Sequence, residues 1–177
     1  MKARLLLCAL LLAGCASGPR APDWQLDARA GAQAYTEAYL AGSRAAEADW
    51  LRTRQTLART AQPERVLRAE LLRCALQVAS LDWQPRCEGF EALRAAASAA
   101  DLAYADYRQG RWPEPTRLAP PQRGVAEQGV RAVTGLDDPL SRLLAAAVLL
   151  RSGTLPRAEQ DAAIALAVET ASGQGWR

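Results

Sequence analysis

The chain contains no histidine, and Lys2 is its only lysine. Histidine is the commonest general base in enzymes and the commonest metal ligand, so its absence removes both uses together. Without a histidine or a second lysine, no serine in the chain has the usual base that would activate it as a nucleophile. No glycine-rich phosphate loop, zinc spacing or dinucleotide fingerprint appears either. We therefore expect a protein that is not an enzyme and that holds no metal ion and no cofactor.

Without histidine and a second lysine, carboxylates are the main catalytic groups that remain. An enzyme that cleaves glycans needs a carboxylic acid that its apolar surroundings keep protonated. None of the acidic groupings lies in an apolar stretch, and several suit the first turn of a helix; they are Glu88 with Glu91, Asp101 with Asp106, and Asp137 with Asp138. An enzyme that acts on peptidoglycan through carboxylates is therefore an alternative that these residues do not favour.

The composition is short of residues that favour strands and balanced in charge. The chain has one phenylalanine and few valines and isoleucines, whereas alanine and leucine are abundant, which favours helices over sheets. Its formal net charge is +3, of which Lys2 and Arg4 contribute two. Such a balance gives no electrostatic reason to expect nucleic acid as a partner.

The start of the chain has the pattern of an export signal. Lys2 and Arg4 precede an apolar run over residues 5–12, followed by small residues and Cys15. With Ala13 and Gly14 the run has about ten residues, half of the roughly 20 that a helix needs to cross a bilayer, so a permanent transmembrane helix is not expected.

Leu12-Ala13-Gly14-Cys15 resembles the lipobox of bacterial prolipoproteins. The resemblance implies removal of residues 1–14, diacylglycerol on the Cys15 sulfur and an acyl chain, such as palmitate, on the new amino terminus. Two or three chains anchor a protein stably, whereas one chain binds only marginally. Ala16, in place of the aspartate that retains enterobacterial lipoproteins in the inner membrane, favours the outer membrane, with the domain facing the periplasm.

Two cysteines remain once Cys8 is removed with the signal and Cys15 carries lipid. In an oxidising compartment, Cys74 and Cys87 are expected to form one disulfide, the alternative being two buried thiols. If the helix that carries Cys74 ran to residue 82, the bridge would be out of reach, because bridged α-carbons lie roughly 4.4–6.8 Å apart. The bridge thus requires this helix to end early or residues 82–86 to double back.

Helical periodicity runs through most of the chain after a tether over residues 15–25. We expect an all-α fold of stacked antiparallel helical hairpins over residues 26–177, which a proline-rich stretch divides into two layers, 26–110 and 122–177. The expected helices cover residues 26–41, 44–60, 63–81, 90–107, 122–135, 140–151 and 156–171.

The paired helices are weakly similar to tetratricopeptide-type repeats, but no second stretch reproduces the motif around Gly42, Trp50 and Pro63. The expectation is thus a solenoid of that type or an irregular bundle.

Arginines and a tryptophan gather around the proline-rich stretch, and both residue types are common in binding hot spots. This candidate partner-binding set is Arg108, Arg111, Trp112, Arg117 and Arg123. The structural alternative is a linker with Trp112 tucked against a helix. Together with the lipid anchor, the set indicates a helical scaffold that binds an envelope protein. A carrier of a small apolar ligand is the other non-catalytic alternative.

Overall fold

The computed structural model describes residues 22–177, so the lipobox and Cys15 lie outside the described residues. The described part is all-helical and contains no strand. Its elements are α1 (Asp23–Leu40), α2 (Ala46–Ala58), α3 (Pro63–Ala79), α4 (Glu88–Glu91), the 3-10 turn η2 (Arg94–Ala96), α5 (Ala99–Arg108), the 3-10 turn η3 (Pro115–Arg117), α6 (Pro120–Gln128), α7 (Val130–Val133), α8 (Pro139–Ser152) and α9 (Arg157–Gln174). None of the helices within residues 22–177 is both long enough and apolar enough to cross a bilayer.

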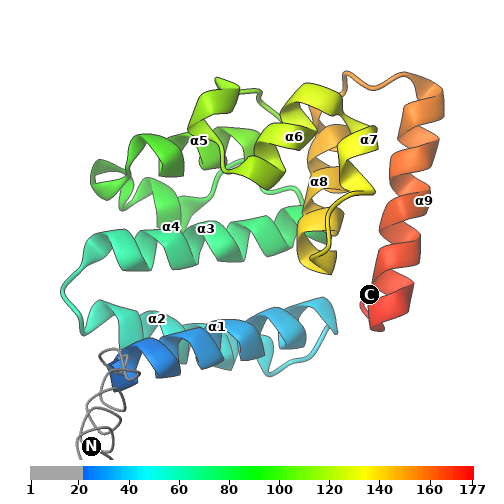
Figure 1. The fold of residues 1–177 in the computed structure, drawn as a ribbon. Helices are drawn as coiled ribbons and strands as arrows, with labels where there is room; N and C mark the ends of the chain where they lie inside the picture. Colours follow the sequence, from blue (N-terminus) through cyan, green and yellow to red (C-terminus); the bar gives the residue numbers. More distant parts are fainter. Residues whose placement is uncertain (1–21) are drawn as a thin grey trace, which may run out of the picture.

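Helix α3 is the central helix, and the other helices pack around it. Figure 1 shows α3 lying between the α1–α2 hairpin and the α4–α5 segment, with the α8–α9 hairpin at the end of α3. The predicted all-α fold of packed helical hairpins is therefore confirmed. Because short helices and 3-10 turns interrupt the middle of the chain, the arrangement is an irregular bundle.

The core fills the spaces that these helices enclose. Tyr35 and Trp50 are almost fully buried between α1 and α2, with ring centroids 5.4 Å apart. The most apolar helix, α8, buries every residue from Leu143 to Leu149 against α3 and the surrounding helices. As the sequence predicts, Asp138 caps this helix by accepting a hydrogen bond from the Ser141 backbone, and Gly153 follows its end.

The structure corrects several expected boundaries. The helix expected over residues 90–107 is split into α4, η2 and α5, because Ser98 and Asp101 form a capping box that starts a new helix. Similarly, Gly129 divides the segment 122–135 into α6 and α7. Helix α1 begins within the expected tether, at Asp23, and α9 continues past Gly173 to Gln174.

The third helix also ends earlier than the expected boundary at residue 81. Helix α3 stops at Ala79, and Leu81 takes a positive φ of 59° and is 57 % exposed instead of joining the buried stripe. This early end returns residues 82–87 toward α3 and brings Cys87 within a Cα–Cα distance of 5.9 Å from Cys74. The predicted disulfide is therefore present, and both routes that the sequence allowed contribute: the helix ends early and the following residues double back.

Candidate functional site

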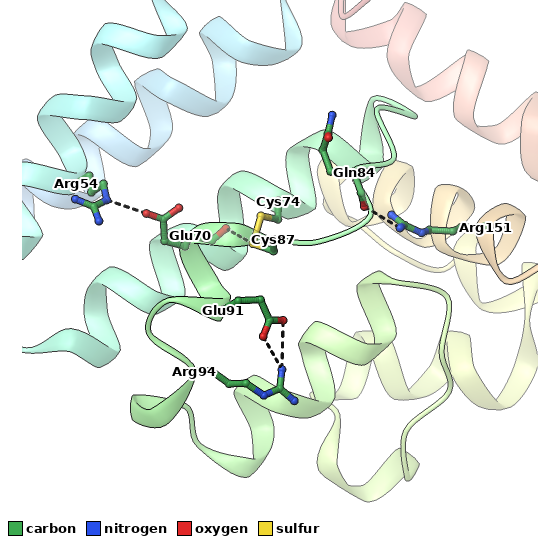
Figure 2. Close-up of a disulfide and its surroundings, with 8 residues drawn as sticks. All are labelled: Arg54, Glu70, Cys74, Gln84, Cys87, Glu91, Arg94 and Arg151. Carbon is green, nitrogen blue, oxygen red and sulfur yellow. Dashed lines mark hydrogen bonds and ion pairs between the residues drawn. A yellow bond between two sulfur atoms is a disulfide. The ribbon is translucent and has the colours of Figure 1, made fainter.

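A cleft of about 620 Å³ opens between α2, α3 and the segment 84–89. The disulfide-bonded Cys74 is part of its lining, so the segment that forms one wall is covalently tied to the helix that forms the floor. A second contact fixes the same segment at its other end, where Arg151 of α8 donates a hydrogen bond of 3.0 Å to the Gln84 carbonyl oxygen. Figure 2 shows both attachments, so this wall is held by α3 and α8 together.

An ion pair joins the two helices across the cleft. Arg54 of α2 donates from Nε to Oε1 of Glu70 on α3 over 2.8 Å, and the Glu70 side chain is buried whereas that of Arg54 is half exposed (Figure 2). Gly89 passes so close to this carboxylate that a Cβ on Gly89 would lie 2.1 Å from Oε2 of Glu70. A glycine at this position therefore makes room for the buried acid.

A second arginine of the cleft is held from two sides. The Arg73 guanidinium lies over the Trp50 ring, 5.1 Å from its centroid, and donates to Glu47 over 2.9 Å. Arg86 is exposed on the cleft wall and has no ion pair with any of residues 22–177. The cleft thus contains several guanidinium groups. Arg86 is the one that has no ion pair among the described residues, so it is available to bind another molecule.

The amides of the cleft complement these charges. Gln77 of α3 and Gln84 of the opposite wall both line it. A primary amide carries both donors and an acceptor, so it can pair with the N–H and C=O groups of an extended peptide. The lining of the cleft therefore combines guanidinium and amide groups with apolar surface from Trp50, Leu51 and Pro85, and it is not an enclosed apolar ligand cavity.

Not all of the candidate partner-binding residues that the sequence predicts are exposed on the surface. Arg108 is 2 % exposed, and Arg123 donates from Nε and Nη2 to the carbonyl oxygens of Pro115 and Leu118. Arg111 pairs with Asp106, and Arg117 pairs with Glu114. Trp112 is 39 % exposed and packs edge-on against Tyr107, with centroids 6.1 Å apart. Only three members of the set, Arg111, Trp112 and Arg117, are therefore exposed.

The two buried carboxylates, Asp101 and Glu70, each accept a hydrogen bond from an arginine. Asp101 accepts hydrogen bonds from Ser98 and from Arg68, whose Nε lies 3.2 Å from Oδ1. Burial opposes ionisation of Asp101, but the hydrogen bonds from Ser98 and Arg68 outweigh it and hold its pKa below the ordinary value. Glu70 is likewise committed to Arg54. Among residues 22–177 no group of three metal-ligating side chains comes together.

Sequence reasoning missed the cleft because its residues are far apart along the chain. Arg54 and Glu70 are separated by 16 positions and Trp50 and Arg86 by more, with no motif that relates them. One signal was present: the expected bridge from Cys74 to Cys87 places the segment around Gln84 and Arg86 beside α3.

These features define the class of the protein as an all-α, disulfide-bonded bundle of helical hairpins with an arginine-lined cleft. Comparison of the chain with models of protein families, with curated proteins and with solved structures finds no match. The function proposed below therefore rests on the residues of the chain itself.

Proposed function

We propose that this chain is a lipid-anchored envelope protein whose helical domain binds an acidic segment of a partner protein in the cleft between α2 and α3. The anchor comes from the resemblance of Leu12-Ala13-Gly14-Cys15 to a lipobox, and the outer-membrane address comes from Ala16. The observation that carries the binding role is the cleft itself, with a wall fixed by the disulfide and by Arg151. A wall fixed in advance lowers the entropic cost of binding.

The chemistry of the cleft favours an acidic, extended peptide as its occupant. Of the three arginines in its lining, Arg54 is paired with Glu70 and Arg73 with Glu47, which leaves the guanidinium group of Arg86 for an acidic partner. Arg86 is suited to a partner carboxylate because it has no acid of its own among the described residues, and arginine binds carboxylates through two parallel hydrogen bonds. The glutamines provide partners for the peptide backbone.

The alternatives receive no support from a specific contact. A carboxylate enzyme needs a protonated acid, but Asp101 has a lowered pKa and Glu70 is paired with Arg54. A carrier of apolar molecules needs an apolar enclosure, and arginine, glutamine and glutamate line much of this cleft.

Site-specific photocrosslinking in cells tests the proposal. A photoreactive amino acid at Leu51, which is exposed on the cleft rim, is expected to capture one envelope protein at a reproducible mass. The matched control is the same amino acid at Val168, which is equally exposed on α9 and away from the cleft. Equal capture at the two positions, or no product at Leu51, would overturn the proposal.

A charge reversal refines the test. Arg86→Glu is expected to reduce capture from Leu51 by about tenfold, because it repels an acidic partner at the rim. Arg157→Glu reverses the charge of an exposed arginine on α9 and is expected to leave capture unchanged. The Cys15→Ser variant, which lacks the acceptor for lipid, is expected to lose capture if the partner lies at the membrane.

A further inference from the structure

Arg108 carries donors that the described part of the protein does not use. It lies in the last turn of α5 and is 2 % exposed, and its Nε and Nη2 atoms are buried without a hydrogen-bond partner among residues 22–177. These two nitrogens lie on the same edge of the guanidinium plane, and their N–H groups point in parallel. This edge is the one that binds two oxygens of a single carboxylate or phosphate. A buried cation without such a partner is strongly unfavourable.

A second arginine lies beside the first. Gly110, two residues after Arg108, approaches the end of α8 so closely that a Cβ on it would lie 3.1 Å from the carbonyl carbon of Arg151. The last turns of α5 and α8 therefore meet, and each contains an arginine. Arg151 donates from Nη2 to the Gln84 carbonyl oxygen (Figure 2), but its Nη1 is also buried without a partner in the described chain.

Two acids near Arg108, Glu91 in space and Asp106 in sequence, are engaged elsewhere. Glu91 binds Arg94 through both carboxylate oxygens at 3.3 Å, as Figure 2 shows, and Asp106 binds Arg111. Arg111 adds a further positive charge near the pair. Among the described residues, neither Arg108 nor Arg151 therefore has an ion-pair partner of its own.

The pKa values of Arg108 and Arg151 are both lowered by these surroundings. Burial, together with the charges of Arg151 and Arg111, lowers the pKa of Arg108 to about 10, although nearby Tyr104 and Glu91 oppose the shift. Burial and Arg111 also lower the pKa of Arg151. Both guanidinium groups remain charged at neutral pH, and an anion between them would relieve their repulsion.

The geometry points to a binding site for a small phosphate-class oxyanion where α5 and α8 meet, held by the Nε and Nη2 edge of Arg108 with Arg151 as the second cation. The low exposure of Arg108 limits the ligand to a small one, and two guanidinium groups match the two charges of phosphate near neutral pH. The source is either inorganic phosphate or the phosphoryl group of a small monoester. This inference does not depend on the partner proposed for the cleft.

Thermal unfolding of the intact protein, purified in detergent, tests the site. Sodium phosphate replaces chloride at constant ionic strength and pH, and the melting temperature is followed as a function of phosphate concentration. A ligand that binds only the folded state raises the melting temperature of a chain of this size by about 5–10 °C at a hundredfold excess over Kd. The expected curve saturates. Glycerol phosphate in a parallel titration distinguishes the two sources, because an equal shift assigns the site to monoesters as well.

Two variants make the result specific. Arg108→Met removes the hydrogen-bonding edge while keeping an unbranched side chain, and it is expected to abolish the phosphate-dependent shift. Arg52→Met makes the same change at an exposed arginine of α2 and is expected to retain it. If Arg108→Met does not fold, Arg151→Met supplies the second test and is expected to weaken the apparent affinity at least tenfold.

Either of two outcomes overturns the inference. One is a wild-type melting temperature that responds equally to phosphate and to chloride, with glycerol phosphate also without effect. The other is a saturable shift that persists in Arg108→Met and in Arg151→Met. Direct titration of the wild type by calorimetry, with the same variants, gives an independent readout that does not depend on unfolding.

Discussion

The carboxylate of Glu70 lies directly over the Cα atom of Gly89, at the position where any other residue would carry its Cβ. A Cβ there would approach Oε2 to 2.1 Å. The contact joins the floor of the cleft to the start of α4, one residue after the Glu88 that lines the wall. A residue without a side chain is thus part of what positions the ion pair between α2 and α3.

Gly89→Ala is therefore expected to displace Glu70 from Arg54 and to lower the free energy of unfolding by about 2–4 kcal/mol, because a buried carboxylate loses its partner. Chemical denaturation measures the change. Gly124→Ala is the matched control: its Cβ would meet only Ala132, at 3.8 Å, in the interior of α6. It is expected to stabilise the protein by about 0.5–1 kcal/mol, as alanine does within a helix. Equal effects of the two substitutions would contradict the steric argument.

Reduction of the disulfide is expected to destabilise the whole domain. Cys74 and Cys87 are separated by 13 positions, and closing a loop of about this length stabilises a protein by about 3 kcal/mol in the chain-entropy model. Urea denaturation with and without reductant measures the difference. The variant Cys74→Ala with Cys87→Ala is expected to match the reduced wild type and to show no response to reductant. A midpoint that reductant leaves unchanged in the wild type would refute the prediction.

The capping box of α5 is expected to give the protein an acid-sensitive component of stability. The pKa of Asp101 is lower in the folded protein than its ordinary value of 3.8. The carboxylate therefore contributes stability above this ordinary value, and the contribution is lost as the pH falls through the lower, folded-state pKa. Asp101→Asn is expected to flatten the pH dependence of the free energy of unfolding in this acidic range.

Ser98→Ala tests the other half of the same box. It removes the hydroxyl that caps the Asp101 backbone N–H over 3.1 Å, and a loss of about 1 kcal/mol is expected near neutral pH. Ser172→Ala, at an exposed position of α9, is the control and is expected to change stability by less than about 0.5 kcal/mol. A parallel pH profile for Asp101→Asn and the wild type would argue against the role of the box.

Comparison of Gly110→Ala with Gly153→Ala separates the steric cost at the contact between α5 and α8 from the cost of a positive φ angle. Their φ angles are +73° and +67°, which alanine adopts at a cost of about 1–2 kcal/mol. A Cβ on Gly110 would also lie 2.8 Å from the Ser152 backbone nitrogen, whereas nothing lies within 4 Å of one on Gly153. Gly110→Ala is thus expected to destabilise the protein by about 1–3 kcal/mol more than Gly153→Ala, because the helix ends must move apart. Equal losses in denaturation experiments would show that the two ends are not tightly packed.

Those parts of the fold that depend on nearby residues could be predicted from the sequence. Asp138-Pro139 and Gly153 mark both ends of α8, and the cysteine count gives the bridge. The break before α5 was also readable, because Ser98 and Asp101 have the spacing of a capping box, but the apolar periodicity that continues through it favoured one long helix.

The site could not be predicted in the same way, because it depends on which helices meet. Arg108 was expected among surface arginines of a binding patch, yet it is buried where α5 approaches α8. Its neighbour Arg151 is 43 positions later in the numbering, and no local pattern connects the two. Similarly, the pairing of Arg54 with Glu70 follows from the packing of α2 on α3, which periodicity alone does not specify.

The end of the described chain returns to its first hairpin. The Arg177 backbone N–H donates to the Leu40 carbonyl oxygen over 2.9 Å, and Trp176 packs against core residues from both ends of the sequence. Because this contact joins positions so far apart, it can form only after residue 177 has been synthesised, and its loop-closure cost is met late in folding. The turn after α1 therefore lacks one of its native contacts until residues 176–177 have docked, so the first hairpin reaches its final packing only after the end of the described chain is in place.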